Sequence, residues 1–313
     1  MIELYSNTIN SKNPTLFVFL VDTSGSMHDP WASSSVGTTL SESAATALNE
    51  VLYDLSLRAC MKDDHVIDRI HIGAYAYGDD SVEWALPGLH EGQGWANAED
   101  WVPGYSRIEK VAVSEDAGRV ITREVPVWFE PGADGSTPMC TAFRKAAEVV
   151  RAHMQAYPDS FPPIVINITD GWPTDTGVPI YRVEDYSPDW GEVSRAAAEI
   201  TSQSCTDGET LLLNIHITPQ ALGDDLTLLF PAQAPAGSHE VVQSMVSISS
   251  VLPANFVLQG RKSGHDLKEG ARGLILNADR TLLSDFLRIG TTLKTHDSET
   301  TDDEQKRLPA PKA

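Results

Sequence analysis

The sequence predicts a doubly wound α/β fold, in which helices flank a mostly parallel sheet in a Rossmann-like arrangement. Residues 16–21 are six consecutive apolar residues, which is typical of a strand buried on both faces of a parallel sheet. Apolar residues then recur every three or four positions across 40–55, which predicts an amphipathic helix. A second strand is expected at 67–77. A strand, a helix and a second strand in this order open a wound α/β fold.

The same two patterns continue along the chain. Spacings of three and four predict further helices at 139–150, 193–200, 241–251 and 282–293. Short apolar runs predict further extended segments at 164–168, 211–218 and 255–258. This alternation of helices and strands is what a wound sheet requires.

The pattern also divides the chain. We expect one domain at 14–294, preceded by an extension at 1–13 and followed by an acidic, disordered tail at 295–313. Residues 78–130 interrupt the regular pattern with many Gly and Pro, and they hold four of the seven tryptophans. This Trp-rich insertion is expected to form an antiparallel hairpin and an elaborated loop, with the tryptophans packing beneath it.

Composition excludes several classes of partner. The formal net charge of −21 argues against nucleic acid, because nucleic-acid-binding proteins concentrate Lys and Arg on one face. It also disfavours anionic membranes, and no apolar run approaches the roughly 20 residues that span a bilayer. The N-terminus lacks the basic and apolar regions of a secretory signal. The three cysteines form no Cys-x-x-Cys pair, so we expect reduced thiols in a cytoplasmic protein.

Polar residues that suit a metal ion follow the predicted strands. The first strand leads directly into Asp22, Ser24 and Ser26, and a later strand leads into Asp170. Thr137 precedes a predicted helix at another strand-to-helix crossover. Ligands of wound sheets bind beyond the carboxyl ends of the strands, and residues two apart in an extended turn point to the same side. We therefore expect these side chains to face one site.

The donor set points to a hard cation. Two carboxylates and three hydroxyls suit Mg²⁺ or Mn²⁺, and the lack of histidine or thiolate excludes a zinc-type cage. At most two protein charges offset the charge of the ion, which therefore stays electrophilic. An incoming Asp or Glu of a partner would add the missing negative charge. The donor set thus gives a physical basis for metal-dependent protein recognition.

The five residues resemble the metal-ion-dependent adhesion site of the von Willebrand factor type A (VWA) family. That site is written Asp-x-Ser-x-Ser, then Thr, then Asp, from three loops, and the match is Asp22, Ser24, Ser26, Thr137 and Asp170. The resemblance implies that the three hydroxyls coordinate the ion directly and the aspartates directly or through water. It also implies a non-enzymatic binding module. The stretch between Ser26 and Thr137 is longer than usual in the family, and the Trp-rich segment accounts for it.

Residues 247–253 and 270–279 also resemble stand-alone intracellular bacterial members of this family, including the tellurite-resistance-associated type. In such systems the domain is often encoded beside protein kinases and PP2C-type phosphatases. The resemblance therefore implies a stress-response, signalling or defence assembly, with a protein kinase or a PP2C-type phosphatase as a candidate partner.

Simpler interpretations of the same residues stay open at the level of the sequence. Ser24 and Ser26 also suit caps of the segment that follows them. Thr137 before Pro138 suits a helix N-cap with proline at the first helical position. Asp170 before a glycine suits an ordinary turn.

Three other functions compete with metal-dependent recognition. Asp22-Thr23-Ser24 and Asp175-Thr176-Gly177 resemble the paired loops of aspartic proteases, but those enzymes are all-β. A metal-dependent phosphohydrolase of the wound α/β type also begins with Asp after a buried strand, but it needs a second Asp where this chain has Ser24. The third is a scaffold whose metal ion is purely structural, which would keep its partner in EDTA.

Overall fold

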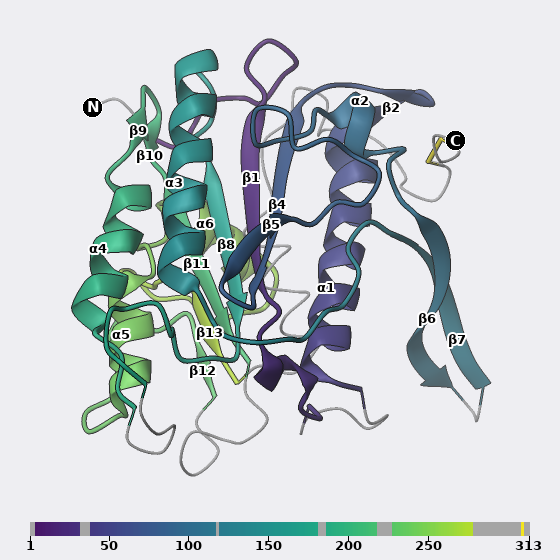
Figure 1. The fold of residues 1–313 in the computed structure, drawn as a ribbon. Helices are drawn as coiled ribbons and strands as arrows, with labels where there is room; N and C mark the ends of the chain where they lie inside the picture. The colour runs from purple at the N-terminus through teal and green to yellow at the C-terminus, as the bar shows by residue number, and fades with distance from the viewer. Residues whose placement is uncertain are drawn as a thin grey trace.

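The centre of the molecule is a seven-stranded sheet with the strand order β12-β13-β11-β8-β1-β4-β5 (Figure 1). The computed structural model describes residues 4–31, 38–116, 119–180, 186–217, 227–277 and 308–309. The strands of this sheet are β1 Thr15–Asp22, β4 Ile70–Gly78, β5 Ser81–Trp84, β8 Ile164–Thr169, β11 Leu211–His216, β12 Leu228–Leu229 and β13 Leu274–Leu276.

The pairing within the sheet is parallel except at its two edges. β1 lies between β4 and β8 and is parallel to both, and β11 is parallel to both β8 and β13. Only the edge strands β5 and β12 pair antiparallel to their neighbours within the described sheet. The prediction of an α/β fold with a mostly parallel sheet is therefore confirmed.

Helices cover both faces of the sheet, and the side chains of β1 contact both layers. Successive residues of a strand point to opposite faces, so Phe17 and Phe19 join one core cluster while Leu16 and Val18 join the other. The first cluster contains residues of α1 (Leu40–Leu55) and α6 (Ala254–Lys262). The second contains residues of α3 (Met139–Ala156), α4 (Trp190–Thr201) and α5 (Glu240–Ile248). Figure 1 shows α3, α4 and α5 together on one side and α1 on the other.

Residues 78–130 form β5, the short helix α2 (Ala98–Trp101) and an antiparallel ladder of β6 (Arg107–Asp116) with β7 (Arg119–Val127). The ladder lies beside α1, apart from the main sheet (Figure 1). Trp101 and Trp128 are buried and pack edge to face, with ring centroids 6.0 Å apart. Trp101 and Trp128 thus pack in the core, as expected. That this segment is an insertion stays a prediction.

Short elements complete the described chain. They are the 3₁₀ turn η1 (Gly25–His28), the π-helical turn η2 (Ser56–Cys60) and two small hairpins, β2 (Met61–Lys62) with β3 (His65–Val66) and β9 (Ser204–Cys205) with β10 (Gly208–Glu209). Across all the residues that the structure describes, no helix has the length and apolar composition needed to cross a bilayer.

One predicted element is wrong. The segment 255–258 was expected to be extended, but it lies within α6. Phe256 and Val257 are buried together with Gly260, so the apolar residues follow a helical spacing that a four-residue window does not show. The helix expected at 282–293 lies outside the described residues, as does the tail at 295–313 except for 308–309. The proposed domain boundaries stay a prediction.

Candidate metal centre

Two neighbouring strands of the sheet end in aspartates. β1 ends at Asp22, and β8 ends at Thr169, directly before Asp170. The two strands are paired in parallel, with Val21 opposite Ile168, so their carboxyl ends meet at the same edge. The Thr169 hydroxyl donates to Oδ2 of Asp22 at 2.6 Å. Parallel pairing therefore brings Asp22 beside the loop that carries Asp170.

The loop after β1 turns back toward Asp170. The Ser24 backbone is extended, and its N–H donates to Oδ1 of Asp22 at 2.8 Å. The chain then enters η1, so Ser26 reaches the site through a 3₁₀ turn and not through the fully extended turn assumed from the sequence. The Ser26 Oγ lies 3.2 Å from the Ser24 Oγ and donates to Oδ1 of Asp170 at 3.0 Å. Four of the candidate ligands are thus linked by short contacts.

Thr137 comes from a third loop and faces the same centre. A Cβ atom built on Gly171 would lie 3.2 Å from Oγ1 of Thr137 and 3.3 Å from Oδ2 of Asp22. The two side chains therefore flank the same small space, which the missing side chain of Gly171 leaves open. The structure thus brings Thr137 to the side chains from the other two loops.

Thr137 does not cap the helix that follows it. The N-cap position of α3 is Pro138, whose side chain makes no capping hydrogen bond. Instead Asp175 accepts hydrogen bonds from the backbone N–H of Cys140 at 3.0 Å and of Thr141 at 2.7 Å. The N-cap interpretation of Thr137 is therefore wrong.

Two residues that sequence reasoning did not assign to the site hold the Thr137 loop. The Thr174 hydroxyl accepts from the backbone N–H of Thr137 at 2.9 Å, and the Thr174 N–H donates to the Thr137 carbonyl at 2.9 Å. Asp175 caps α3 directly after that loop. Neither position has a local pattern that reveals this role. The sequence likeness of Asp175 to an aspartic protease loop therefore coincides, in the structure, with a carboxylate that accepts from helix amides.

The electrostatics of the centre are unfavourable without a positive charge. Asp22 is fully buried and Asp170 is 8% exposed. Burial raises the pKa of Asp22, although hydrogen bonds from Ser24 and Thr169 lower it in part. Burial first, and then the charge of Asp22, raises the pKa of Asp170. The two carboxylates therefore resist being ionised together.

One polar atom of the centre lacks a partner. Oδ2 of Asp170 is buried and has no hydrogen-bond partner among the residues that the structure describes. A buried oxygen of this kind is costly unless an ion or a water satisfies it. Ser26 is exposed, so the centre lies at the molecular surface. The donors that converge are carboxylate and hydroxyl oxygens, which fit Mg²⁺ or Mn²⁺.

Among the described residues no three His, Cys, Asp or Glu side chains gather as a metal-binding group. The convergent set differs from such a group, because only two of its members are carboxylates and the other three are hydroxyls. A hard cation with few protein charges around it is the species that this set would bind.

Comparison with known proteins assigns no family. No family model and no curated protein matches the chain. Among solved structures, the human COPII-coat protein Sec24c is similar at a TM-score of 0.39 and 12% identity, over 91% of this chain and 33% of Sec24c. The adhesive tip pilin GBS104 of Group B Streptococcus agalactiae has a TM-score of 0.26 and 12% identity, over 84% of this chain and 73% of the pilin. The pilus adhesin RrgA of Streptococcus pneumoniae has a TM-score of 0.28 and 14% identity, over 84% of this chain and 33% of RrgA.

The chain therefore spans about one third of the length of Sec24c. At these TM-scores and identities, the similarities carry neither a family nor a function over to this chain.

Proposed function

We propose that this chain is a non-enzymatic protein-binding module of the VWA type whose binding depends on a metal ion. Asp22, Ser24, Ser26, Thr137 and Asp170 hold Mg²⁺ or Mn²⁺, and the ion binds a carboxylate that a protein partner presents. The observation that carries the proposal is the buried Asp170, which keeps one oxygen without a described partner beside the fully buried Asp22.

Charge balance supports this function. Two carboxylates at most neutralise a divalent cation, and the hydroxyls of Ser24, Ser26 and Thr137 add donors without adding charge. When bound, the ion supplies a Lewis-acidic position that an external Asp or Glu can occupy. The protein side chains fix the position of the ion near the surface, where Ser26 is exposed. A partner residue would then bring the negative charge that the site lacks.

The cellular setting belongs to the proposal through the VWA resemblance alone. We place the module in the bacterial cytoplasm, in a stress-response, signalling or defence assembly. A protein kinase or a PP2C-type phosphatase is the candidate partner.

The contacts of Asp22 favour binding over hydrolysis. A phosphohydrolase of the wound α/β type needs this aspartate as an accessible nucleophile. Here Oδ1 accepts from the Ser24 N–H and Oδ2 accepts from the Thr169 hydroxyl, and the side chain is fully buried. The residue two positions later is Ser24, whose hydroxyl is no substitute for a carboxylic acid in proton transfer.

Calorimetric titration with Mg²⁺ and with Mn²⁺ tests the metal site. Asp22→Asn is expected to weaken binding at least tenfold, because it removes one of two charges that face the ion. Asp207→Asn is the matched control, since Asp207 is also buried and accepts from the backbone N–H groups of Ser6 and Asn7, each at 2.9 Å. That control should bind metal as the natural chain does. Failure of the natural chain to bind either ion at millimolar concentration would overturn the proposal.

A pull-down in magnesium and in EDTA separates recognition from a purely structural metal. The proposal expects the partner to be released by EDTA and lost in Asp22→Asn. A scaffold with a structural ion would retain its partner in both conditions.

A further inference from the structure

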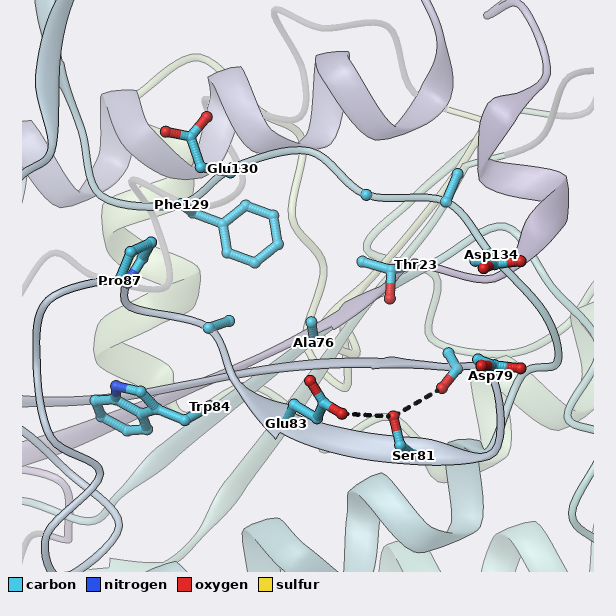
Figure 2. Close-up of a pocket in the computed structure, with 14 residues that line it drawn as sticks. Thr23, Ala76, Asp79, Ser81, Glu83, Trp84, Pro87, Phe129, Glu130 and Asp134 are labelled. Atoms are coloured by element: carbon cyan, nitrogen blue, oxygen red, sulfur yellow. Dashed lines mark hydrogen bonds between the residues drawn. The ribbon is translucent and has the colours of Figure 1, made fainter.

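A second concave site lies beside the candidate metal centre. It is a groove of about 540 Å³, and none of the five candidate metal ligands lines it. Three segments build it: the end of β1, the β4–β5 hairpin and the loop after β7 (Figure 2). Its lining includes Thr23, Ala76, Glu83, Trp84, Phe129 and Asp134. We refer to it as the β5 groove.

The metal centre and the β5 groove share one wall. Thr23 lines the groove, while its neighbours Asp22 and Ser24 face the metal centre, because successive side chains of extended backbone point to opposite sides. The Thr23 carbonyl accepts from the N–H of Asp134 at 2.6 Å, and its N–H donates to the Tyr77 carbonyl at 2.9 Å. The backbone at Thr23 is therefore held on both sides, and a ligand that crosses it passes from one site to the other.

The groove combines apolar walls with an inward carboxylate. Figure 2 shows the Phe129 ring pointing into the space above Ala76, and the Glu83 carboxylate directed into the same space from β5. Trp84 lies at one end, and Asp79 and Asp134 lie at the other end, near Thr23. A groove that combines apolar residues with carboxylates matches a long side chain that has an aliphatic stem and a cationic head.

Three of the four carboxylates that line the groove have no lysine or arginine partner within the described part of the chain. Glu83 accepts from the Ser81 hydroxyl at 3.3 Å. Among the described residues, neither Asp79, Asp134 nor Glu83 pairs with a lysine or arginine. Glu130 differs, because Arg107 pairs with it and its carboxylate is turned away from the Phe129 ring (Figure 2).

We propose that the β5 groove binds a lysine or arginine side chain of the same partner segment whose Asp or Glu reaches the metal ion. This inference rests on the proposed function. The aliphatic stem packs against Ala76 and Phe129, and the charged head meets Glu83 with the Trp84 ring near it. The net charge of −21 adds a long-range attraction for a partner segment that carries a cation.

The mixed apolar and acidic lining of the groove favours a peptide cation over a bare metal ion. The carboxylates of the groove do not gather, within the described residues, as a group of three that could hold a metal ion, and Ala76, Trp84 and Phe129 offer no oxygen donors. A lysine or arginine buries its stem and keeps its charge at the carboxylate. The partner motif that follows is an acidic residue with a basic residue nearby in the chain.

Selection from a random peptide library on the magnesium-loaded protein tests this motif. The probe is the library itself, selected in parallel on the natural chain, on Glu83→Gln and on Glu269→Gln. Glu83 and Glu269 are both exposed, and Glu269 precedes β13 on the opposite side of the sheet. Thermal denaturation of each variant verifies that it is folded. The affinities of enriched peptides are then measured in magnesium and in EDTA.

We expect peptides that carry both an acidic and a basic residue, with binding that EDTA abolishes. Glu83→Gln should weaken these peptides about three- to tenfold, the range of a partly exposed ion pair with a cation–π contact. Glu269→Gln should leave their affinity unchanged.

The remaining outcomes separate the two proposals. Magnesium-dependent peptides with an acidic residue but no basic preference would overturn the groove assignment and leave the proposed function standing. Peptides with a basic residue that bind equally in EDTA and weaken in Glu83→Gln would support the groove and overturn the link to the metal. Enrichment of no magnesium-dependent and no basic peptide would overturn both.

Discussion

The Ser26 hydroxyl donates to Oδ1 of Asp170 across 3.0 Å, and the two residues stand 144 positions apart in the chain. This contact joins the loop after β1 to the loop after β8 at the carboxyl edge of the sheet. It occupies one oxygen of Asp170 and leaves the other, which is buried, without a described partner. The contact therefore holds the loops after β1 and β8 together at the centre.

Asp170→Asn should separate stability from metal binding. Without metal the variant removes one of two buried carboxylates that repel each other, so we expect it to be more stable than the natural chain in EDTA, by about 1 kcal/mol. In magnesium the order reverses, because an ion at 100 times its dissociation constant stabilises the natural chain by about 2.7 kcal/mol. Urea unfolding in EDTA and in magnesium measures both effects. An equal response of the two proteins to magnesium would contradict the assignment of Asp170.

Gly171→Ala should disturb the ion without unfolding the protein. The new methyl group would lie 3.2 Å from Oγ1 of Thr137 and 3.3 Å from Oδ2 of Asp22, so it crowds two candidate ligands. We expect magnesium affinity to fall about tenfold in calorimetry, with a small change in thermal stability. Gly25→Ala is the control within the same site, since its methyl group meets only ordinary contacts, the nearest at 3.5 Å. Equal metal affinities in the two variants would show that Thr137 does not face the ion.

His216 should make the fold sensitive to mild acid. Burial lowers its pKa to about 4, whereas an unfolded chain holds a histidine near 6.5. Between these values the unfolded state binds the extra proton, so stability is fully present above about pH 6.5 and is lost as the pH falls toward 4. The loss approaches about 1.4 kcal/mol per pH unit within that window.

His216→Leu should remove this contribution, and neither ring nitrogen has a partner that the substitution would strand within the described chain. Chemical denaturation at pH 5 and at pH 7.5 provides the measurement. Relative to the natural chain, the free energy of unfolding of His216→Leu should be higher at pH 5 than at pH 7.5. His90→Leu, at an exposed histidine, should show no such change. An unchanged pH slope in His216→Leu would refute the prediction.

Asn49→Ala should loosen the segment that carries the wall of the β5 groove. The buried Asn49 side chain donates to the Phe129 carbonyl at 2.8 Å and accepts from the N–H groups of Trp128 and Phe129, each at 2.9 Å. Loss of these contacts leaves buried backbone groups unpaired, so we expect a destabilisation of about 3 kcal/mol in urea unfolding. Asn97→Ala, at an exposed position, should change stability by less than about 0.5 kcal/mol. If Asn49→Ala lost as little stability as Asn97→Ala, the segment would be held by packing alone.

Local pattern was sufficient for much of the fold. The apolar runs that became β1 and β8 and the three-and-four spacing of α1 and α3 were visible without any knowledge of contacts. The same runs placed Asp22 and Asp170 at strand ends. Pattern failed at 255–258, because one turn of α6 in isolation is indistinguishable from a short strand.

The support of the site was not predictable in the same way. In the sequence Asp175 resembles part of a protease loop, yet in the structure it caps α3. Thr174 has no motif at all, and it holds the backbone of Thr137. A hydrogen bond from a side chain to the backbone of a distant loop leaves no periodic signal, so a single sequence cannot show it.

Residue types and their periodicity thus identified buried strands, amphipathic helices and the oxygen-bearing residues at strand ends, because burial of a regular element imposes a short repeat on the chain. The placement of β1 between β4 and β8, the contact of Ser26 with Asp170 and the groove between Glu83 and Phe129 came from the folded molecule. Each of these depends on which distant segments pack together, and the free energy of the whole core determines that packing.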